Sequence, residues 1–211
     1  VTVTIGGNSI SYTSSTFACA GTASGEHCTA NLDQASISAA VDQLPVNLGA
    51  TLDAIKTKAP QAIIVLVTYP RVFPEDAVSC NELELSAEDT TYLATLGQKL
   101  QNIFVSTAAE HQILIADAYV RAAGHGPCAA TERWVNGATA ADTGIRFHPT
   151  AEGHIEMARL ARCGGGVGSV WPEAVAGAAF RLGAVDCGPL RHGDGAAGDQ
   201  RVAVAVDAGA G

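Results

Sequence analysis

Along the chain, segments with the hydrophobic pattern of a strand alternate with segments that have the hydrophobic spacing of a helix. The first five residues, Val1-Thr-Val-Thr-Ile5, alternate apolar and polar positions as in a strand, and Gly6 and Gly7 end it. Segments 62–67 and 112–117 are short and largely apolar, which is typical of parallel strands buried on both faces. The pattern therefore predicts a sheet built from segments that lie far apart in the sequence.

Longer segments between these strands carry apolar residues at helical spacing. One helix is expected from Ala30 to about Lys58, broken or kinked at Pro45, and its apolar stripe is Ile37, Val41, Leu44, Leu48, Leu52 and Ile55. A second begins near Ser86 and Asp89, which approximate a capping box, and continues with Leu93, Leu96, Leu100, Ile103 and Phe104. Strands that alternate with helices specify a three-layer α/β/α sandwich with a parallel sheet.

Composition narrows the class of protein. The chain has 211 residues, of which 47% are hydrophobic and 16% charged, enough for one domain with a buried core. A net charge of −9 argues against nucleic-acid partners, which select for clustered Lys and Arg. No run of residues approaches the roughly 18 apolar residues of a membrane-spanning helix. We expect a monomer with neither a nucleic-acid partner nor a transmembrane segment.

The turn after the first strand is the first candidate for chemistry. Asn8 follows Gly6 and Gly7 at the carboxyl end of a strand, where α/β sheets usually place ligands. An asparagine amide at this place can donate a hydrogen bond to an oxyanion. The alternative is an asparagine that only closes a turn.

A histidine 140 residues later is the second candidate. His148 precedes Pro149, which can open a helix, so the imidazole is expected at a loop-to-helix junction where it can act as a general base. His154, six residues on, is interpreted as a residue on the face of that helix, and Met157 and Leu160 as its core stripe. The alternative for His148 is a structural role.

Taken together, the strand-Gly-Gly-Asn8 and His148-Pro149 segments resemble two of the four signature blocks of the SGNH hydrolases, or GDSL esterases and lipases. The resemblance implies a flavodoxin-like fold and a serine hydrolase of carboxylic esters, without metal or cofactor. It also implies that Asn8 holds the oxyanion, that Gly7 shapes its turn and that His148 is the base. The substrate would be a small-molecule or lipid ester, as in lipid metabolism.

The chain departs from the family pattern at two positions. Most members have an aspartate three residues before the histidine, where this chain has Ile145. In the secreted actinobacterial-type branch a main-chain carbonyl orients the ring instead, which here points to Arg146 or Ile145. Asp142 is a weaker substitute. In the oxyanion block Ser9 replaces the usual aspartate, and both residues are compatible with a turn.

The family's nucleophile block, Gly-Asp-Ser on the first strand, does not occur in this sequence, and neither does a Gly-x-Ser-x-Gly elbow. None of the serines near Asn8 has the required context; they are Ser9, Ser11, Ser14 and Ser15. We therefore expect a fragment of a longer hydrolase whose first strand and nucleophile are missing. Two alternatives stay open: a non-catalytic binding or structural remnant of that fold, and a flavodoxin-like nucleotide binder, which lacks a convincing phosphate loop.

Six cysteines without a Cys-x-x-Cys pair favour disulfides formed in an oxidising compartment, and thus a secreted, extracellular protein. The resemblance implies that Cys19 pairs with Cys28 and that Cys80 pairs with Cys128. The pairing of Cys163 and Cys187 is left open.

The composition changes after Cys163. In residues 164–211, 23 of 48 residues are Gly or Ala. Gly-rich chains lose much conformational entropy when they adopt a single structure. We expect a hydrolase domain over residues 1–163 and an unstructured or frame-shifted tail over 164–211. The alternative is that Arg201–Asp207 forms a strand that pairs with the bare edge of the sheet.

Overall fold

The computed structural model describes residues 1–20, 27–74, 76, 79–139, 144–162 and 204–206. Within this part of the chain, a parallel sheet has the strand order β3-β2-β1-β4. Its strands are β1 (Thr2–Thr4), β2 (Val65–Val67), β3 (Leu114–Ala116) and β4 (Val204–Val206). In register, Thr2 lies opposite Val65, and Val65 lies opposite Leu114. Because parallel strands end at the same edge, the residues that follow β1 and β2 are brought together.

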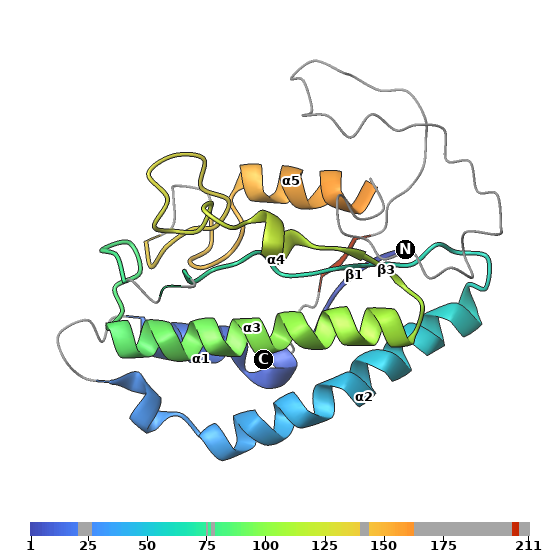
Figure 1. Ribbon diagram of the computed structural model, residues 1–211, viewed down its shortest axis with the longest axis horizontal. Coiled ribbons are helices and arrows are strands. Elements are labelled where there is room, and N and C mark those ends of the chain that lie inside the picture. Colours follow the sequence, from blue (N-terminus) through green and yellow to red (C-terminus); the bar gives the residue numbers. More distant parts are fainter. Residues whose placement is uncertain (21–26, 75, 77–78, 140–143, 163–203, 207–211) are drawn as a thin grey trace.

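Helices cover both faces of the sheet (Figure 1). On one face lie α1 (Tyr12–Cys19), α2 (Gln34–Lys58) and α3 (Ala87–Glu110), and on the other lies α5 (Ala151–Arg162). In β2 the Leu66 side chain joins the larger core on the α1–α3 face, whereas Val65 and Val67 pack in a second cluster with Leu160 of α5. Burial on both faces explains the continuous apolar run of this strand. The prediction of a three-layer α/β/α sandwich is confirmed.

Helix α2 differs from its prediction at two places. It begins at Gln34 and not at Ala30, because the Asp33 side chain accepts a hydrogen bond from the Ser36 N–H at 3.0 Å and caps the helix there. It also runs through Pro45 without a break, which leaves the kink as the remaining expectation at this residue. Leu44, Leu48 and Leu52 are at most 2% exposed, and this packing offsets the hydrogen bond that proline cannot make.

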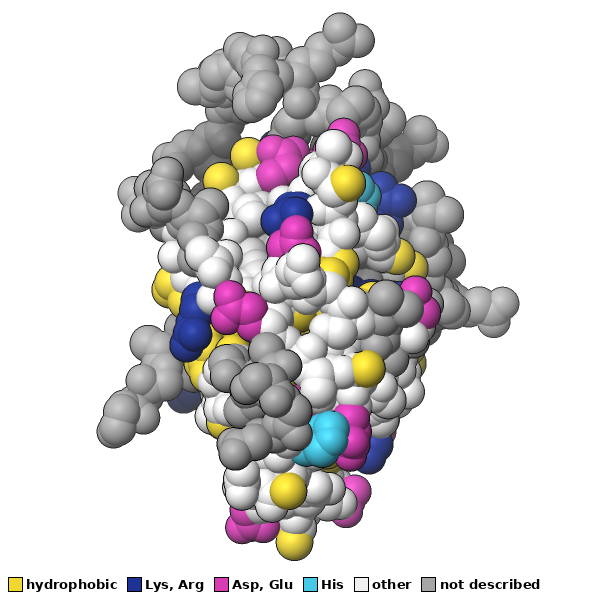
Figure 2. Space-filling view, turned by 90° about the vertical axis from the view of Figure 1, so that its left-hand side faces the viewer, with side chains coloured by type: hydrophobic (Ala, Val, Ile, Leu, Met, Phe, Trp, Pro, Cys, Tyr) yellow, Lys and Arg dark blue, Asp and Glu magenta, His cyan; other side chains and the backbone are white. Residues whose placement is uncertain are grey.

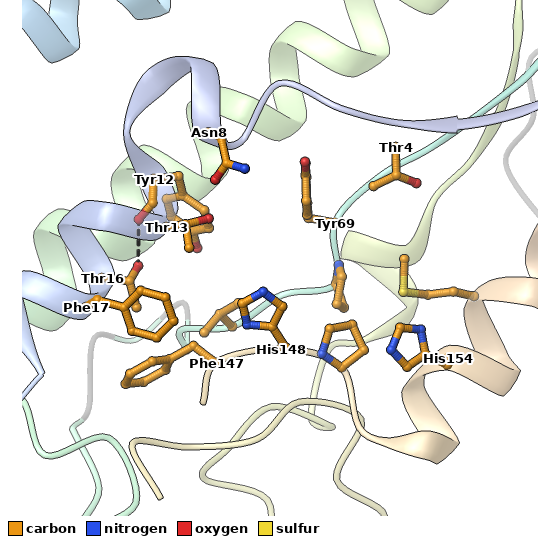
Figure 3. Close-up of a pocket in the computed structure, with 14 residues that line it drawn as sticks. Thr4, Asn8, Tyr12, Thr13, Thr16, Phe17, Tyr69, Phe147, His148 and His154 are labelled. Atoms are coloured by element: carbon orange, nitrogen blue, oxygen red, sulfur yellow. Dashed lines mark hydrogen bonds between the residues drawn. The ribbon is translucent and has the colours of Figure 1, made fainter. Parts of the chain in front are cut away.

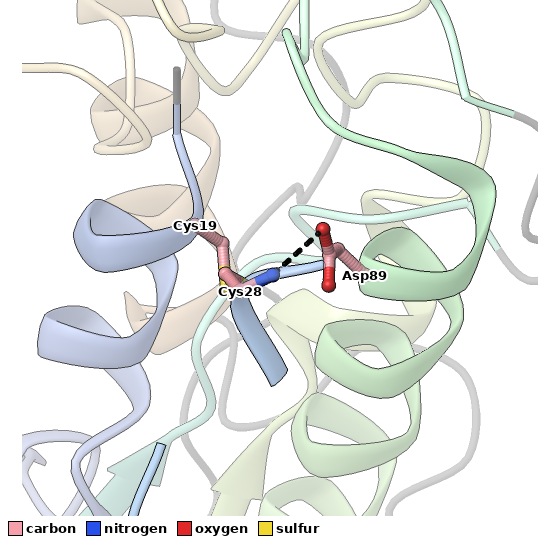
Figure 4. Close-up of side chains that lie close together, drawn as sticks. All are labelled: Cys19, Cys28 and Asp89. Atoms are coloured by element: carbon pink, nitrogen blue, oxygen red, sulfur yellow. Dashed lines mark hydrogen bonds between the residues drawn. A yellow bond between two sulfur atoms is a disulfide. The ribbon is translucent and has the colours of Figure 1, made fainter. Parts of the chain in front are cut away.

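The start of α3 follows the predicted capping pattern and extends it. Ser86 Oγ accepts from the Asp89 N–H at 3.0 Å. The Asp89 carboxylate is fully buried and accepts from the N–H groups of Cys28 and Thr29 at 3.4 Å each (Figure 4). Asp89 therefore ties α3 to the short 3-10 helix η2 (Cys28–Asn31), which begins at Cys28 of the Cys19–Cys28 disulfide.

Two disulfides join the pairs that the resemblance implied. Cys19 is bonded to Cys28, and Cys80 to Cys128, with Cα–Cα distances of 4.9 and 5.7 Å. The second bridge links the loop before α3 to the segment that follows the short helix α4 (Ala118–Arg121). Cys163 and Cys187 lie outside the described residues.

Strand β4 pairs in parallel with β1, with Thr2 opposite Val204 and Thr4 opposite Val206. This is the pairing that the alternating segment Arg201–Asp207 offered as an alternative to an unstructured tail. Residues 163–203 and 207–211 lie outside the described part of the chain, so the domain boundary at residue 163 remains a prediction.

Candidate active site

The turn after β1 places Asn8 at the edge of the sheet. Gly6 has a φ of +107°, a conformation that favours glycine, and Asn8 then opens the 3-10 helix η1 (Asn8–Ile10). The Gly7 carbonyl accepts from the Tyr12 N–H at 2.9 Å, and the Asn8 carbonyl accepts from the Ser11 N–H at 3.0 Å. The Asn8 side chain is exposed and makes no hydrogen bond to any described residue, so its amide N–H groups are available to a ligand.

A second loop, just before α5, carries His148. Phe147 is non-glycine yet has a φ of +56°, in the left-handed region, and it is only 8% exposed. Such a backbone costs about 1–3 kcal/mol and persists only where the surroundings hold it. Here Phe147 packs against the Phe73 ring at 6.2 Å, and its N–H donates to the Gly137 carbonyl at 3.2 Å. The strained residue fixes the direction in which His148 leaves the loop.

The His148 ring is oriented by the main chain. Its Nδ1 lies 2.8 Å from the Arg146 carbonyl oxygen. Because a carbonyl oxygen only accepts, Nδ1 carries the proton, and Nε2 of the neutral ring is left with a lone pair. The Ile145 carbonyl is engaged elsewhere, by the N–H of His148 at 3.2 Å and by Nδ2 of Asn136 at 3.1 Å. Of the two carbonyls that the sequence left open, the structure brings the one of Arg146 to the ring.

Both candidate residues line one cleft of about 260 Å³. Figure 3 shows Asn8 and the His148 ring on opposite sides of it. The lining residues are Thr4, Asn8, Tyr12, Thr13, Thr16, Phe17, Tyr69, Pro70, Val72, Phe147, His148, Pro149, His154 and Met157. None of them is a serine or carries a carboxylate, ammonium or guanidinium group. The cleft is therefore suited to an uncharged ligand with apolar parts.

Several lining residues were not singled out from the sequence. The Phe17 ring of α1 stacks on His148 with 6.2 Å between centroids, and the Arg146 guanidinium lies 5.1 Å from the centre of the same ring. Tyr69 and Pro70 come from the loop after β2. Their individual contacts depend on partners far away in the chain, so no local signal identified them.

The residues of α5 differ partly from their interpretation. His154 lies on the helix as expected and is exposed, but it also lines the cleft. Leu160 is core at 2% exposed. Met157 packs against the second core cluster and also lines the cleft. Asp142, the weaker candidate for orienting the ring, lies outside the described residues.

Two of the hydroxyl groups in the cleft, those of Tyr12 and Thr16, are neutral or already engaged. Burial, and to a lesser degree the charge of Tyr119, raises the pKa of Tyr12 well above its ordinary value, so Tyr12 stays protonated at any working pH. Thr16 Oγ1 donates to the Tyr12 carbonyl at 2.8 Å. Neither group is poised to act as a nucleophile.

Within the described part of the chain, the possible metal-ligand group and the charged side chains lie outside the cleft lining. Among the described residues, Cys19, Cys28 and Asp89 form the single cluster with metal-ligand spacing, and its two sulfur atoms are joined in a disulfide (Figure 4). On the face in Figure 2, the coloured acidic and basic side chains are scattered among other groups. No helix in the described ranges is long and apolar enough to cross a bilayer.

Comparison with known proteins places the chain in a family. Residues 1–154 match the GDSL-like Lipase/Acylhydrolase family, and the chain belongs to it. Lipase 1 of Streptomyces coelicolor is 29% identical over 154 residues, and the lipase of Streptomyces rimosus is 30% identical over 155. Each match covers 72% of this chain and 55% of the relative. The chain thus spans about half the length of the curated relatives it matches.

Solved structures agree with this assignment. The crystal structure of the extracellular lipase from Streptomyces rimosus superposes with a TM-score of 0.62 at 26% identity, over 76% of this chain and 68% of that one. Phospholipase A1 from Streptomyces albidoflavus NA297 gives the same TM-score and coverage at 24% identity, which supports the fold alone. The resemblance to SGNH hydrolases is confirmed.

Proposed function

We propose that this chain supplies the general base and an oxyanion donor of a serine hydrolase that cleaves carboxylic esters. The observation that carries the proposal is that Asn8 and His148, 140 residues apart in sequence, line the same cleft. The hydrogen bond from Nδ1 to the Arg146 carbonyl leaves Nε2 as a proton acceptor. Membership of a lipase/acylhydrolase family supports this class of reaction.

The reaction would run through an acyl-enzyme. Nε2 of His148 takes the proton of a serine hydroxyl while the serine oxygen bonds to the ester carbonyl carbon, and the Asn8 amide donates to the resulting oxyanion. Collapse of the tetrahedral intermediate breaks the ester bond, and His148 gives its proton to the departing alcohol. Water then attacks the acyl-enzyme with His148 as base, and this step releases the acid and the free serine.

The serine itself is proposed to come from a segment outside this sequence. Neither a Gly-Asp-Ser block nor a serine among the described cleft residues supplies it. The uncharged lining and the rings of Phe17 and Phe147 favour a neutral ester with an apolar acyl group. The two disulfides, and the name of an extracellular relative, support secretion into an oxidising compartment.

Covalent labelling tests this proposal. A fluorophosphonate reacts with a serine that a neighbouring base has activated, and mass spectrometry locates the modified peptide. We would label the 211-residue chain and a chimera in which the part of the Streptomyces rimosus lipase that precedes the matched residues is fused ahead of Val1. We expect label on a serine of the fused segment in the chimera, no label on the chain alone, and loss of labelling in His148→Ala.

A matched control and two outcomes make the test decisive. His27→Ala removes an exposed imidazole that is paired with Glu88 and does not line the cleft, so it should label like the unmodified chimera. Label on Ser9, Ser11, Ser14 or Ser15 of the chain alone would place the nucleophile inside this sequence. A folded chimera that takes up no label would contradict the proposed function.

One observation favours a second function, that of a non-catalytic remnant that binds an ester or lipid. The cleft is well formed, yet its described lining includes no serine. Such a protein would bind a non-hydrolysable ester analogue through the cleft with the same affinity in the chain and the chimera. The chimera would remain unlabelled.

A further inference from the structure

Tyr69 lies where the two parts of the cleft meet. It follows β2 by two residues, and its hydroxyl oxygen accepts a hydrogen bond from the Gly7 N–H at 3.3 Å, across 62 residues of sequence. We propose that Tyr69 is a positioning residue that holds the Gly6–Asn8 turn and thereby aims the Asn8 amide into the cleft. The kinetic consequence of this inference rests on the proposed function, whereas the structural part does not.

The other hydrogen bonds of the turn are local. The carbonyls of Gly7 and Asn8 accept from residues 12 and 11, in the segment that directly follows. The Gly7 N–H, in contrast, donates its hydrogen bond to a residue that follows the neighbouring strand β2. Because the Asn8 carboxamide makes no hydrogen bond to any described residue, its direction is set by the backbone that carries it. The Tyr69 contact is therefore a hydrogen bond that ties the turn carrying Asn8 to the exit of β2.

Packing supports the same conclusion. A Cβ atom built on Gly7 would lie 3.1 Å from Cζ and 3.2 Å from the hydroxyl oxygen of Tyr69, closer than ordinary van der Waals contact. The ring edge and the turn are thus in direct contact, and a side chain at Gly7 would require the ring to shift by a few tenths of an ångström. The φ of Gly7 is −59°, so the backbone conformation alone would accept other residues. Glycine at this position allows the close approach of the Tyr69 ring.

Tyr69 is itself held rigidly enough to serve as an anchor. Its ring stacks on that of Phe104 in α3, with 5.9 Å between centroids and 18° between planes, and Phe104 is fully buried. Thr68, directly before it, is also fully buried. The Thr68 N–H donates to the Ala116 carbonyl at 3.0 Å, and its hydroxyl accepts from the Tyr119 N–H at 2.9 Å. The exits of β2 and β3 are therefore tied together beneath the tyrosine.

The first experiment needs no activity. Amide hydrogen exchange by NMR on the 211-residue chain would compare the unmodified protein with Tyr69→Phe. We expect the Gly7 amide to exchange at least about tenfold faster, and the side-chain amide signals of Asn8 to shift, because the N–H loses its partner. Gly7→Ala, which forces the same ring and turn apart, should shift the same Asn8 signals. Tyr92→Phe is the control, since Tyr92 is a half-buried tyrosine of α3 outside the cleft and should change neither.

The second experiment measures the coupling to Asn8 in the chimera. Tyr69→Phe should lower kcat about tenfold and leave KM within about twofold, since a misplaced oxyanion donor affects the transition state more than binding. In the background of Asn8→Ala the same change should have little further effect, because Tyr69 acts through Asn8. A residue that only stabilises the fold would lower activity equally in both backgrounds.

The outcomes separate this inference from the proposed function. If Gly7 exchange is unchanged in Tyr69→Phe, or if the kinetic effects of Tyr69→Phe and Asn8→Ala are additive, Tyr69 does not position Asn8. If the chimera shows no hydrolysis that depends on His148, the proposed function fails. The exchange data then still decide whether Tyr69 holds the turn.

Discussion

At the scale of single residues, the His148 loop is held by backbone groups and by one buried amide. Asn136 is 6% exposed, its N–H donates to the His148 carbonyl at 2.9 Å, and its side chain donates to the Ile145 carbonyl at 3.1 Å. A Cβ on Gly144 would lie 2.4 Å from Nδ2 of Asn136, so the loop passes directly over this amide. Asn136 therefore fixes the chain on both sides of the Arg146 carbonyl that orients the ring.

This arrangement predicts that Asn136→Ala destabilises the fold. Removal of a buried side-chain hydrogen bond costs about 1–2 kcal/mol, because the carbonyl partner loses one of its two donors. Urea unfolding should therefore show a lower midpoint with an unchanged slope. Asn47→Ala is the matched control: Asn47 lies exposed on α2, and its replacement should change stability by less than about 0.5 kcal/mol. Equal stability of Asn136→Ala and the unmodified chain would show that this amide does not hold the loop.

The sequence could indicate Asn8 and His148 because each belongs to a short motif with a recognisable spacing. It could not choose between Arg146 and Ile145, because a main-chain carbonyl carries no side-chain signal. Neither Asn136 nor Tyr69 belongs to such a motif. Their contacts reach 9 and 62 residues along the chain, and no local pattern encodes such distances.

At the scale of elements, the start of α5 joins the His148 loop to the Trp134–Asn136 segment. Thr150 Oγ1 accepts from the Gly153 N–H at 3.1 Å and donates to the Arg133 carbonyl at 2.8 Å, and the Thr150 N–H donates to the Trp134 carbonyl at 2.9 Å. A Cβ on Gly153 would lie 2.0 Å from that same carbonyl oxygen of Trp134. The helix and the segment are thus packed backbone against backbone.

This close approach predicts that Gly153→Ala is destabilising, although alanine favours helix by about 1 kcal/mol. Overpacking against a backbone atom typically costs about 1–3 kcal/mol and here should exceed the gain in propensity. Thermal unfolding would show a lower Tm. Gly126→Ala is the control, since its nearest contact would be 3.4 Å, an ordinary distance. A Tm for Gly153→Ala at or above that of the unmodified chain would mean that α5 does not lie this close to Trp134.

The existence of the helices and strands was easier to predict from the sequence than their exact ends and irregularities. The apolar stripes of α2 and α3 and the runs of β2 and β3 follow from burial, which acts on many residues at once. The start of α2 depends on the capping hydrogen bond of Asp33. The passage of the helix through Pro45 depends on whether tertiary packing offsets the missing hydrogen bond of proline. The sequence around a proline does not show how deeply the neighbouring leucines are buried, and that burial decides whether the helix stays continuous.

At the scale of the whole molecule, three loop regions meet at the cleft beside residues of α1 and α5: the turn after β1, the loop after β2 and the loop before α5. The parallel sheet brings the first two to one edge, and α5, on the opposite face from α1–α3, brings the third. The fold thus joins an amide donor and a basic imidazole in one cleft whose described lining lacks a serine.

Hydrolysis of p-nitrophenyl butyrate tests the central claim most directly. The initial rate would be measured for the 211-residue chain, the chimera and their His148→Ala and Asn8→Ala variants. We predict hydrolysis by the chimera alone, reduced about 10²–10⁴-fold by His148→Ala and about 10²–10³-fold by Asn8→Ala. A chimera whose rate is unaffected by either substitution would contradict the assignment of base and oxyanion donor, and His148-dependent hydrolysis by the chain alone would contradict an external serine.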